Sequence, residues 1–249
     1  MRGGETAIQQ LRGPSLSANR RRVAIAALAI VASGCLPRTR LAVHYLPGFV
    51  PGSQNIFSPV KIGVPPTAGS FSSGACDVGS IYDVSGAAQT RLSVADPTRV
   101  FSDALVKGLK GAGLEPIALD SMPSHGVPPE GSDFILISRL EKFEVDKRFG
   151  AEETVHGQYF SMTAEVRAKF ELRSRSGDVL YAGVIAGLED EPPAPVGREV
   201  FLPLETEPAE SLSVALSRAV GRLIIEPKFR AALPSKWVEN KPATPTPKR

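Results

Sequence analysis

The stretch from residue 160 to residue 173 restricts the possible folds of this chain more than any other. Apolar and polar residues alternate through all of it, in the order FSMTAEVRAKFELR. Because successive side chains of a β-strand point to opposite faces of a sheet, this period of two predicts a long strand with one buried and one wet face. A strand of this kind needs neighbouring strands and a cover for its apolar side. The chain is therefore expected to build a sheet packed against helices.

Similar patterns predict the other elements. Residues 176–178 (Ser-Gly-Asp) predict a turn, and 179–188 predict the strand that returns beside the long one. Asp96 followed by Pro97 predicts the start of a helix over 96–113. The remaining segments are predicted strands at 60–64, 115–119 and 133–146 and a helix that buries Leu212 to Ile224.

Cys35 ends a run that is typical of exported proteins. Three arginines at 20–22 precede ten apolar residues at 23–32, and Ser-Gly stands directly before the cysteine. A basic start, a short apolar run and small residues before a cleavage site describe a secretory signal. The apolar run is half as long as the about 20 residues that a transmembrane helix needs. The pattern resembles the lipobox of bacterial lipoproteins, in which the signal is cleaved before the cysteine and its thiol is acylated.

This resemblance implies a location. Two or more acyl chains on Cys35 would hold the protein stably at a membrane, whereas a single chain binds only marginally. Residue 36 is leucine and not aspartate, which by the sorting rules of Gram-negative lipoproteins implies the periplasmic side of the outer membrane. An ordinary soluble signal peptide with a chance cysteine stays an alternative, and the adjacent arginines leave both general secretory and twin-arginine export open.

Composition divides the chain into four predicted parts. Residues 1–34 are the lipoprotein signal peptide, and 35–59 are the lipidated cysteine and a flexible tether rich in proline and glycine. A single domain is expected over 60–233. Within it, the Gly- and Ser-rich stretch 67–94 is predicted to be ordered but without regular secondary structure. The tail at 234–249 is proline-rich and polar, which predicts disorder.

Charge and cysteine content exclude several classes of protein. The first 34 residues hold five arginines and one glutamate of the chain's 29 basic and 26 acidic residues, so the mature chain has a formal charge of about −1. A nucleic-acid-binding protein needs a basic face that this balance does not provide, so no nucleic acid partner is expected. Cys76 is the only cysteine after Cys35, and the fold therefore has to rely on its apolar core without an internal disulfide.

The order of the predicted elements resembles that of the YajG-type bacterial lipoproteins and, more loosely, the auxiliary lipoproteins of envelope ABC transporters. The resemblance covers roughly 60 to 233 and is carried by the succession of strand, helix, strand, long strand, hairpin and helix. It implies an α+β domain with a mixed, mostly antiparallel sheet of about four to five strands and two helices packed on one face. It also implies no enzymatic activity and no catalytic residues. The segments that carry it are 60–64, 96–113, 133–143, 164–181 and 227–233.

Residues that commonly carry chemistry are present but scattered. His44, His125 and His156 have no second ligand at the spacing that a metal site needs. Ser124 and Cys76 have no base or oxyanion donors in a recognisable setting. Motifs such as a nucleophile elbow or a phosphate-binding loop do not occur in the sequence. We therefore expect a non-enzymatic protein with no cofactor, no metal and no catalytic residue.

The wet face of the long strand is the remaining candidate for function. It mixes both signs of charge, so it is either a solvated sheet surface or a docking surface for an envelope partner. The sequence thus favours a membrane-anchored accessory lipoprotein that binds another envelope protein. The alternative is an accessory that holds a lipid or small hydrophobic ligand for an envelope ABC transporter. The candidate interaction residues are Glu165, Arg167, Lys169, Glu171 and Arg173.

Overall fold

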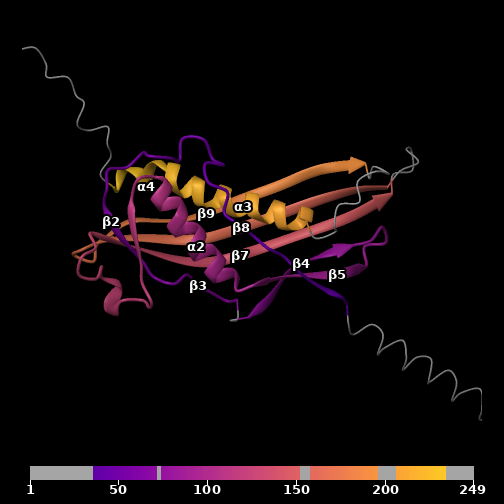
Figure 1. Ribbon diagram of the computed structural model, residues 1–249, viewed down its shortest axis with the longest axis horizontal. Helices are drawn as coiled ribbons and strands as arrows, with labels where there is room; N and C mark the ends of the chain where they lie inside the picture. The colour runs from indigo at the N-terminus through magenta and orange to yellow at the C-terminus, as the bar shows by residue number, and fades with distance from the viewer. Residues whose placement is uncertain (1–35, 72–73, 152–157, 196–205, 234–249) are drawn as a thin grey trace, which may run out of the picture. The chain divides into compact units, whose positions relative to one another are not determined.

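The computed structural model describes residues 36–71, 74–151, 158–195 and 206–233 (Figure 1). Nine strands and three α-helices are formed within these ranges. The strands are β1 (Arg38–Arg40), β2 (Lys61–Val64), β3 (Ala68–Gly69), β4 (Ala75–Tyr82), β5 (Ala88–Ala95), β6 (Glu115–Ala118), β7 (Phe134–Ala151), β8 (Gln158–Ser174) and β9 (Val179–Pro195). The helices are α2 (Pro97–Gly111), α3 (Thr206–Ile225) and α4 (Pro227–Ala231), with a 3₁₀ turn at Ser124–Gly126.

Strand β7 organises the sheet. Along one edge it pairs antiparallel with β8 over its full length, and β8 pairs antiparallel with β9. Along its other edge β7 pairs with β2, β3 and β4 in succession, all in parallel. Strand β6 extends the sheet beyond β2, while β5 and β1 extend it beyond β4. The three long strands β7, β8 and β9 therefore form a continuous antiparallel surface.

The helices cover one side of these long strands. Asp96 caps α2 by accepting a hydrogen bond from the amide of Arg99 at 3.0 Å, and Pro97 fits the first helical position because it needs no amide partner. Phe101 of α2 packs against Phe170 of β8, with ring centroids 6.0 Å apart. Helices α2 and α3 also contact each other, and Gly108 lets Val220 approach. The even-numbered residues of β8 from 162 to 172 lie buried in this core.

The expected fold class is wrong. The described sheet has nine strands and not four to five, and three helices accompany it and not two. The main cause is residues 67–94, which form β3, β4 and most of β5. Register shifts between Asp77 and Gly79 and between Ile81 and Tyr82 interrupt the alternation of β4. Such bulges change which face successive side chains occupy, so the period of two is lost in the sequence although the backbone still pairs.

The segment expected to be a flexible tether is also different in the structure. Its first residues form β1, which pairs with β5, and the compact unit starts at Pro37. Leu41 and Phe57 are buried in the core. The amides of His44 and Leu46 donate to the hydroxyls of Ser213 and Ser217 on α3, at 3.0 and 2.8 Å. The serines of α3 thus satisfy backbone groups that a coil would leave to water, and the segment packs despite its prolines and glycines.

This packing predicts a large loss of stability from Phe57→Ala. The Phe57 ring is fully buried and meets the Phe229 ring edge-on at 6.1 Å, so its removal should cost about 3–5 kcal/mol. Phe49→Ala is the matched control, because Phe49 belongs to the same segment but is 40% exposed; it should cost no more than about 1 kcal/mol. Urea unfolding of both variants checks the prediction, and equal small losses would show that this segment does not contribute to the core.

Candidate functional site

The side of β7, β8 and β9 that faces away from the helices is called the open face here. The alternation of β8 is confirmed, and it places all five predicted interaction residues, Glu165, Arg167, Lys169, Glu171 and Arg173, on this face. Neighbouring residues of β7 and β9 complete three cross-strand rows. The cationic row is Arg139–Lys169–Val184, the central row is Lys142–Arg167–Ala186, and the acidic row is Glu144–Glu165–Leu188.

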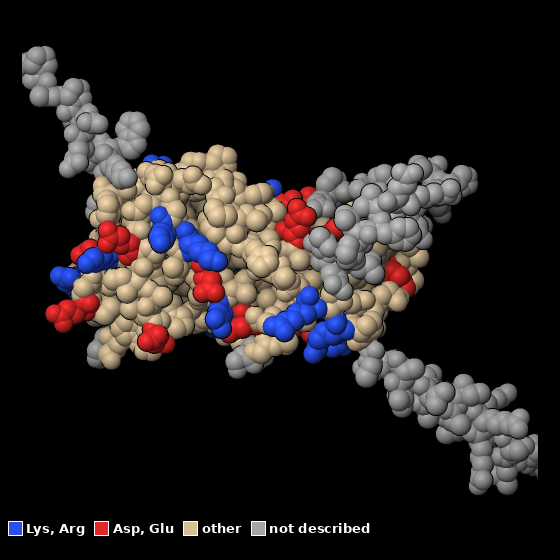
Figure 2. Space-filling view, in the orientation of Figure 1, with Lys and Arg blue, Asp and Glu red and all other residues tan. Residues whose placement is uncertain are grey.

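Charges of the same sign lie directly opposite each other in these rows. Arg139 pairs with Lys169, Lys142 with Arg167, and Glu144 with Glu165. Like charges in directly opposed positions destabilise a sheet. Figure 2 views the molecule from the side of the helices, and there basic and acidic side chains are interspersed among larger uncharged areas. The open face thus separates charge by row.

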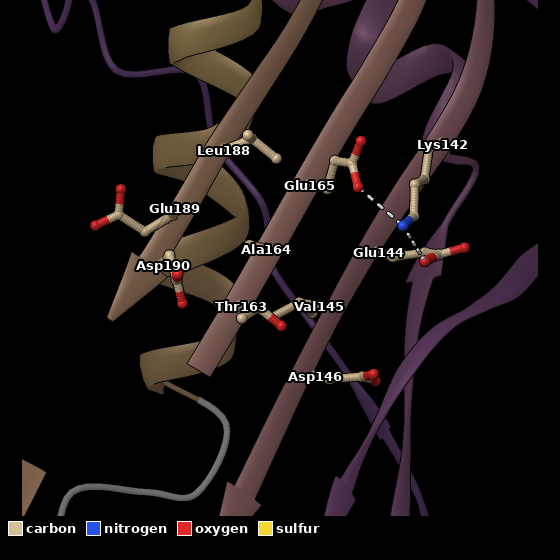
Figure 3. Close-up of a pocket in the computed structure, with 10 residues that line it drawn as sticks. All are labelled: Lys142, Glu144, Val145, Asp146, Thr163, Ala164, Glu165, Leu188, Glu189 and Asp190. Atoms are coloured by element: carbon tan, nitrogen blue, oxygen red, sulfur yellow. Dashed lines mark hydrogen bonds and ion pairs between the residues drawn. The ribbon is translucent and has the colours of Figure 1, made fainter. Parts of the chain in front are cut away.

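Diagonal ion pairs offset part of this repulsion. The Lys142 ammonium lies 2.9 Å from Glu165 and 3.1 Å from Glu144 (Figure 3), and Arg167 also pairs with Glu165. The hydrogen bond from Lys142, followed by that from Arg167, lowers the pKa of Glu165. The hydrogen bonds to Glu165 and Glu144 raise the pKa of Lys142. Both shifts favour the charged forms of Glu165 and Lys142.

The cationic row has no such compensation. Arg139 and Lys169 are both exposed, and neither forms an ion pair with another described residue. A guanidinium and an ammonium group that lie side by side without a counter-ion attract an anionic group. The cationic row is therefore the part of the open face with the most unmet charge.

Apolar side chains border the charged rows along β9. Val184 is 53% exposed and Leu188 is 47% exposed, at the ends of the cationic and acidic rows. Beside Leu188, a shallow recess of about 230 Å³ is lined by acidic residues such as Glu144, Asp146 and Asp190 (Figure 3). Exposed apolar groups bordered by charges are typical of surfaces that bind other proteins.

The free edge of β9 is less accessible than its open face. The Arg218 guanidinium donates to the carbonyl of Leu188 and pairs with Glu189, and Arg222 donates to the carbonyl of Ala186 at 2.7 Å. These bonds occupy main-chain acceptors to which another strand would bind, and covering an edge in this way is a common protection against strand addition. Docking on this part of the molecule is therefore expected to use the side chains of the open face.

Sequence reasoning missed the contributions of β7 and β9. A bulge at Glu141 shifts the register between Leu140 and Lys142. Before it the odd residues of β7 point to the open face, as Arg139 does, and after it the even residues do, as Lys142 and Glu144 do. A signal was present, since the pattern of β7 reads as alternating only if one residue is skipped. The exposure of Val184 and Leu188 had no sequence signal, because apolar residues in a strand normally indicate burial.

The other residues singled out in the sequence do not assemble into a site within the described ranges. Cys35 and His156 lie outside these ranges, and the side chain of His125 is not described. His44 is exposed, whereas Cys76 is buried in β4, where its thiol contacts the carbonyl of Gly74 at 3.7 Å. Ser124 is exposed and begins the 3₁₀ turn. Among the described residues no group of three or more His, Cys, Asp or Glu is placed to hold a metal ion, and none of the described helices is long and apolar enough to span a bilayer.

Comparisons with known proteins give structural similarities only. No family model and no curated protein matches the chain. A protein of family DUF330 from Xanthomonas campestris is 12% identical with a TM-score of 0.47, covering 78% of this chain and 96% of that one. A putative neuraminyllactose-binding hemagglutinin homologue from Helicobacter pylori is 10% identical with a TM-score of 0.42, covering 78% and 95%. Lipoprotein GNA1162 from Neisseria meningitidis is 15% identical with a TM-score of 0.28, covering 53% and 84%.

One of these structures is described as a lipoprotein. At these identities and TM-scores the similarities assign neither a family nor a function to this chain. The resemblance to YajG-type lipoproteins therefore stays a prediction from the sequence.

Proposed function

We propose that this protein is a bacterial envelope lipoprotein, held by acyl chains on Cys35, that acts without enzymatic activity by docking another envelope component on its open face. The observation that carries the proposal is the row-wise separation of charge next to exposed Val184 and Leu188. The signal-like residues before Cys35 support the anchor. A place on the periplasmic side of the outer membrane and a YajG-type relationship belong to the same proposal.

The position of β1 makes the anchor short. Only Leu36 and Pro37 separate Cys35 from Arg38, the first residue of β1. Three residue steps span at most about 10 Å, compared with about 80 Å for an extended chain of two dozen residues. An acylated Cys35 would therefore hold the domain directly at the membrane surface. A docking surface on it would meet partners that lie within or close to the bilayer.

The packing between sheet and helices favours docking over the ligand-binding alternative. Phe101, Phe143, Phe170 and Leu216 fill this space and are fully buried. A lipid or small hydrophobic ligand held between sheet and helices would have to displace such side chains. The open face needs no rearrangement to receive a partner, so we prefer it as the functional surface.

Site-specific photocrosslinking in intact envelopes tests this proposal. A photoreactive residue at position 184 should yield a discrete adduct, because Val184 lies on the open face. The matched control is position 84, where the turn after β4 holds a valine of nearly equal exposure, 55% against 53%. Adding Arg139→Glu and Lys169→Glu should remove the adduct at position 184, since reversing these charges repels an anionic partner. Equal labelling at positions 84 and 184, or an adduct insensitive to the charge reversal, would contradict docking on this face.

A further inference from the structure

The open face carries a pattern that identifies its occupant. We propose that a second copy of this chain docks there, face to face, around a two-fold axis that runs along the central row Lys142–Arg167–Ala186. The inference rests on the proposed docking function and names the partner. It is built from the register of β7, β8 and β9 and from the side chains that this register places on one face.

The two-fold axis exchanges the rows on either side of it. Because the axis runs across the strands, each strand of one copy faces the same strand of the other. A residue one row before the central row then faces the residue one row after it in that strand of the other copy. The cationic row of one copy therefore lies against the acidic row of the other. Arg139 meets Glu144, and Lys169 meets Glu165. At the β9 end of the same rows, Val184 meets Leu188, so apolar groups also face each other.

This self-complementarity favours a second copy over an unrelated protein. In a two-fold interface each residue contact occurs twice, with the roles of the copies exchanged, and one surface has to match itself. Here the cationic and acidic rows lie at equal distance from the central row, about 6.6 Å given two residues per row step. Each row ends in an exposed apolar residue on β9. Arg139 and Lys169, which form no ion pair with another described residue, thereby obtain carboxylates from the second copy.

The central row does not oppose this arrangement strongly. It brings Lys142 and Arg167 near their own copies, but both side chains already pair with Glu165 within one chain. Ala186 is small and leaves room on the axis. Arg218 and Arg222 stay in place, because facing sheets contact each other through side chains and not through the edge carbonyls that these arginines bind.

The size of the face indicates a weak dimer. The three rows across three strands cover roughly 300 Å² per copy, from strand and residue spacings of about 4.8 and 3.3 Å. Both copies together then bury about 600 Å² through these rows, which is below the about 1,200–2,000 Å² of stable specific interfaces. Acyl chains that confine both copies to one membrane raise their effective concentration and favour such a contact. Because ion pairs carry much of it, the association should weaken as salt is raised.

Charge reversal of one contact provides the first test. Arg139→Glu places like charges against Glu144 of the other copy, and Glu144→Arg places like charges against Arg139. Each variant alone should associate about tenfold more weakly than the parent chain. An equimolar mixture should recover parental association, because each of its two contacts then joins opposite charges. Sedimentation of the lipidated full chain in detergent measures this, and a mixture as weak as either single variant would overturn the proposal.

A cross-link on the axis separates this inference from the proposed function. Facing sheets lie about 10 Å apart, too far for a direct disulfide, so Ala186→Cys is joined with a short bismaleimide in intact envelopes. A product of twice the chain mass supports the second copy, and Val84→Cys is the control that should give none. A product with a different protein overturns the inference but leaves the docking function in place. Absence of any product at position 186 overturns the inference alone, because the bismaleimide needs a thiol on both chains. The docking function is then judged by the photoreactive residue at position 184, which needs no thiol on the partner.

Discussion

Gly187→Ala will destabilise the domain severely, by about 2–4 kcal/mol in the free energy of unfolding. A Cβ atom on Gly187 would lie 1.9 Å from the carbonyl oxygen of Ala215 and 2.4 Å from the amide nitrogen of Ala219. Both atoms belong to the backbone of α3, so no side-chain rotation relieves the clash. Helix α3 would have to move away from β9 and open the core at Leu216 and Val220, which are fully buried.

Gly111→Ala is the matched control for this prediction. The substitution is the same, but a Cβ on Gly111 meets no atom within 4 Å. Because alanine favours helix and restricts the unfolded chain, this variant should be unchanged or more stable by up to about 1 kcal/mol. Thermal and urea unfolding compare the two variants. Equal effects would mean that β9 and α3 do not approach each other as closely as the structure has them.

Cys35→Ser will move the protein from the membrane fraction to the soluble fraction of the envelope. Stable anchoring requires at least two acyl chains, worth roughly 0.8 kcal/mol per buried methylene, and serine offers no thiol to carry them. Cys76→Ser is the control: Cys76 is buried in β4, so this variant should stay with the membrane. Fractionation followed by immunodetection reads both outcomes. Retention of Cys35→Ser in washed membranes would require another means of attachment.

Local signals predicted the elements whose pattern is uninterrupted. The alternation at 160–173 became β8 within one or two residues at each end, and the proline-capped helix became α2. Both follow from nearest neighbours along the chain, where side-chain direction and capping decide the conformation. The turn at 176–178 and the start of the return strand at 179 are confirmed for the same reason, although β9 runs on to Pro195 and not only to 188.

Long-range pairing decided the parts that local signals did not predict. β1 is a strand because β5 offers it main-chain partners, although its own sequence is Arg-Thr-Arg. Phe57 is buried because α4 presents Phe229 to it. The bulge at Glu141 sets which side chains of β7 reach the open face, so only half of the candidate site was visible in the sequence. Each of these contacts joins residues far apart in the chain, where single-sequence patterns carry little information.

The membrane anchor, and with it the class of partners that the docking surface can reach, depends on what the mature chain begins with. Mass spectrometry of the N-terminal peptide from protein purified out of native membranes examines this directly. The account predicts a peptide that begins at Cys35 and carries the added mass of two or three fatty acyl chains. A peptide that begins at another residue, or at Cys35 with an unmodified thiol, would contradict it.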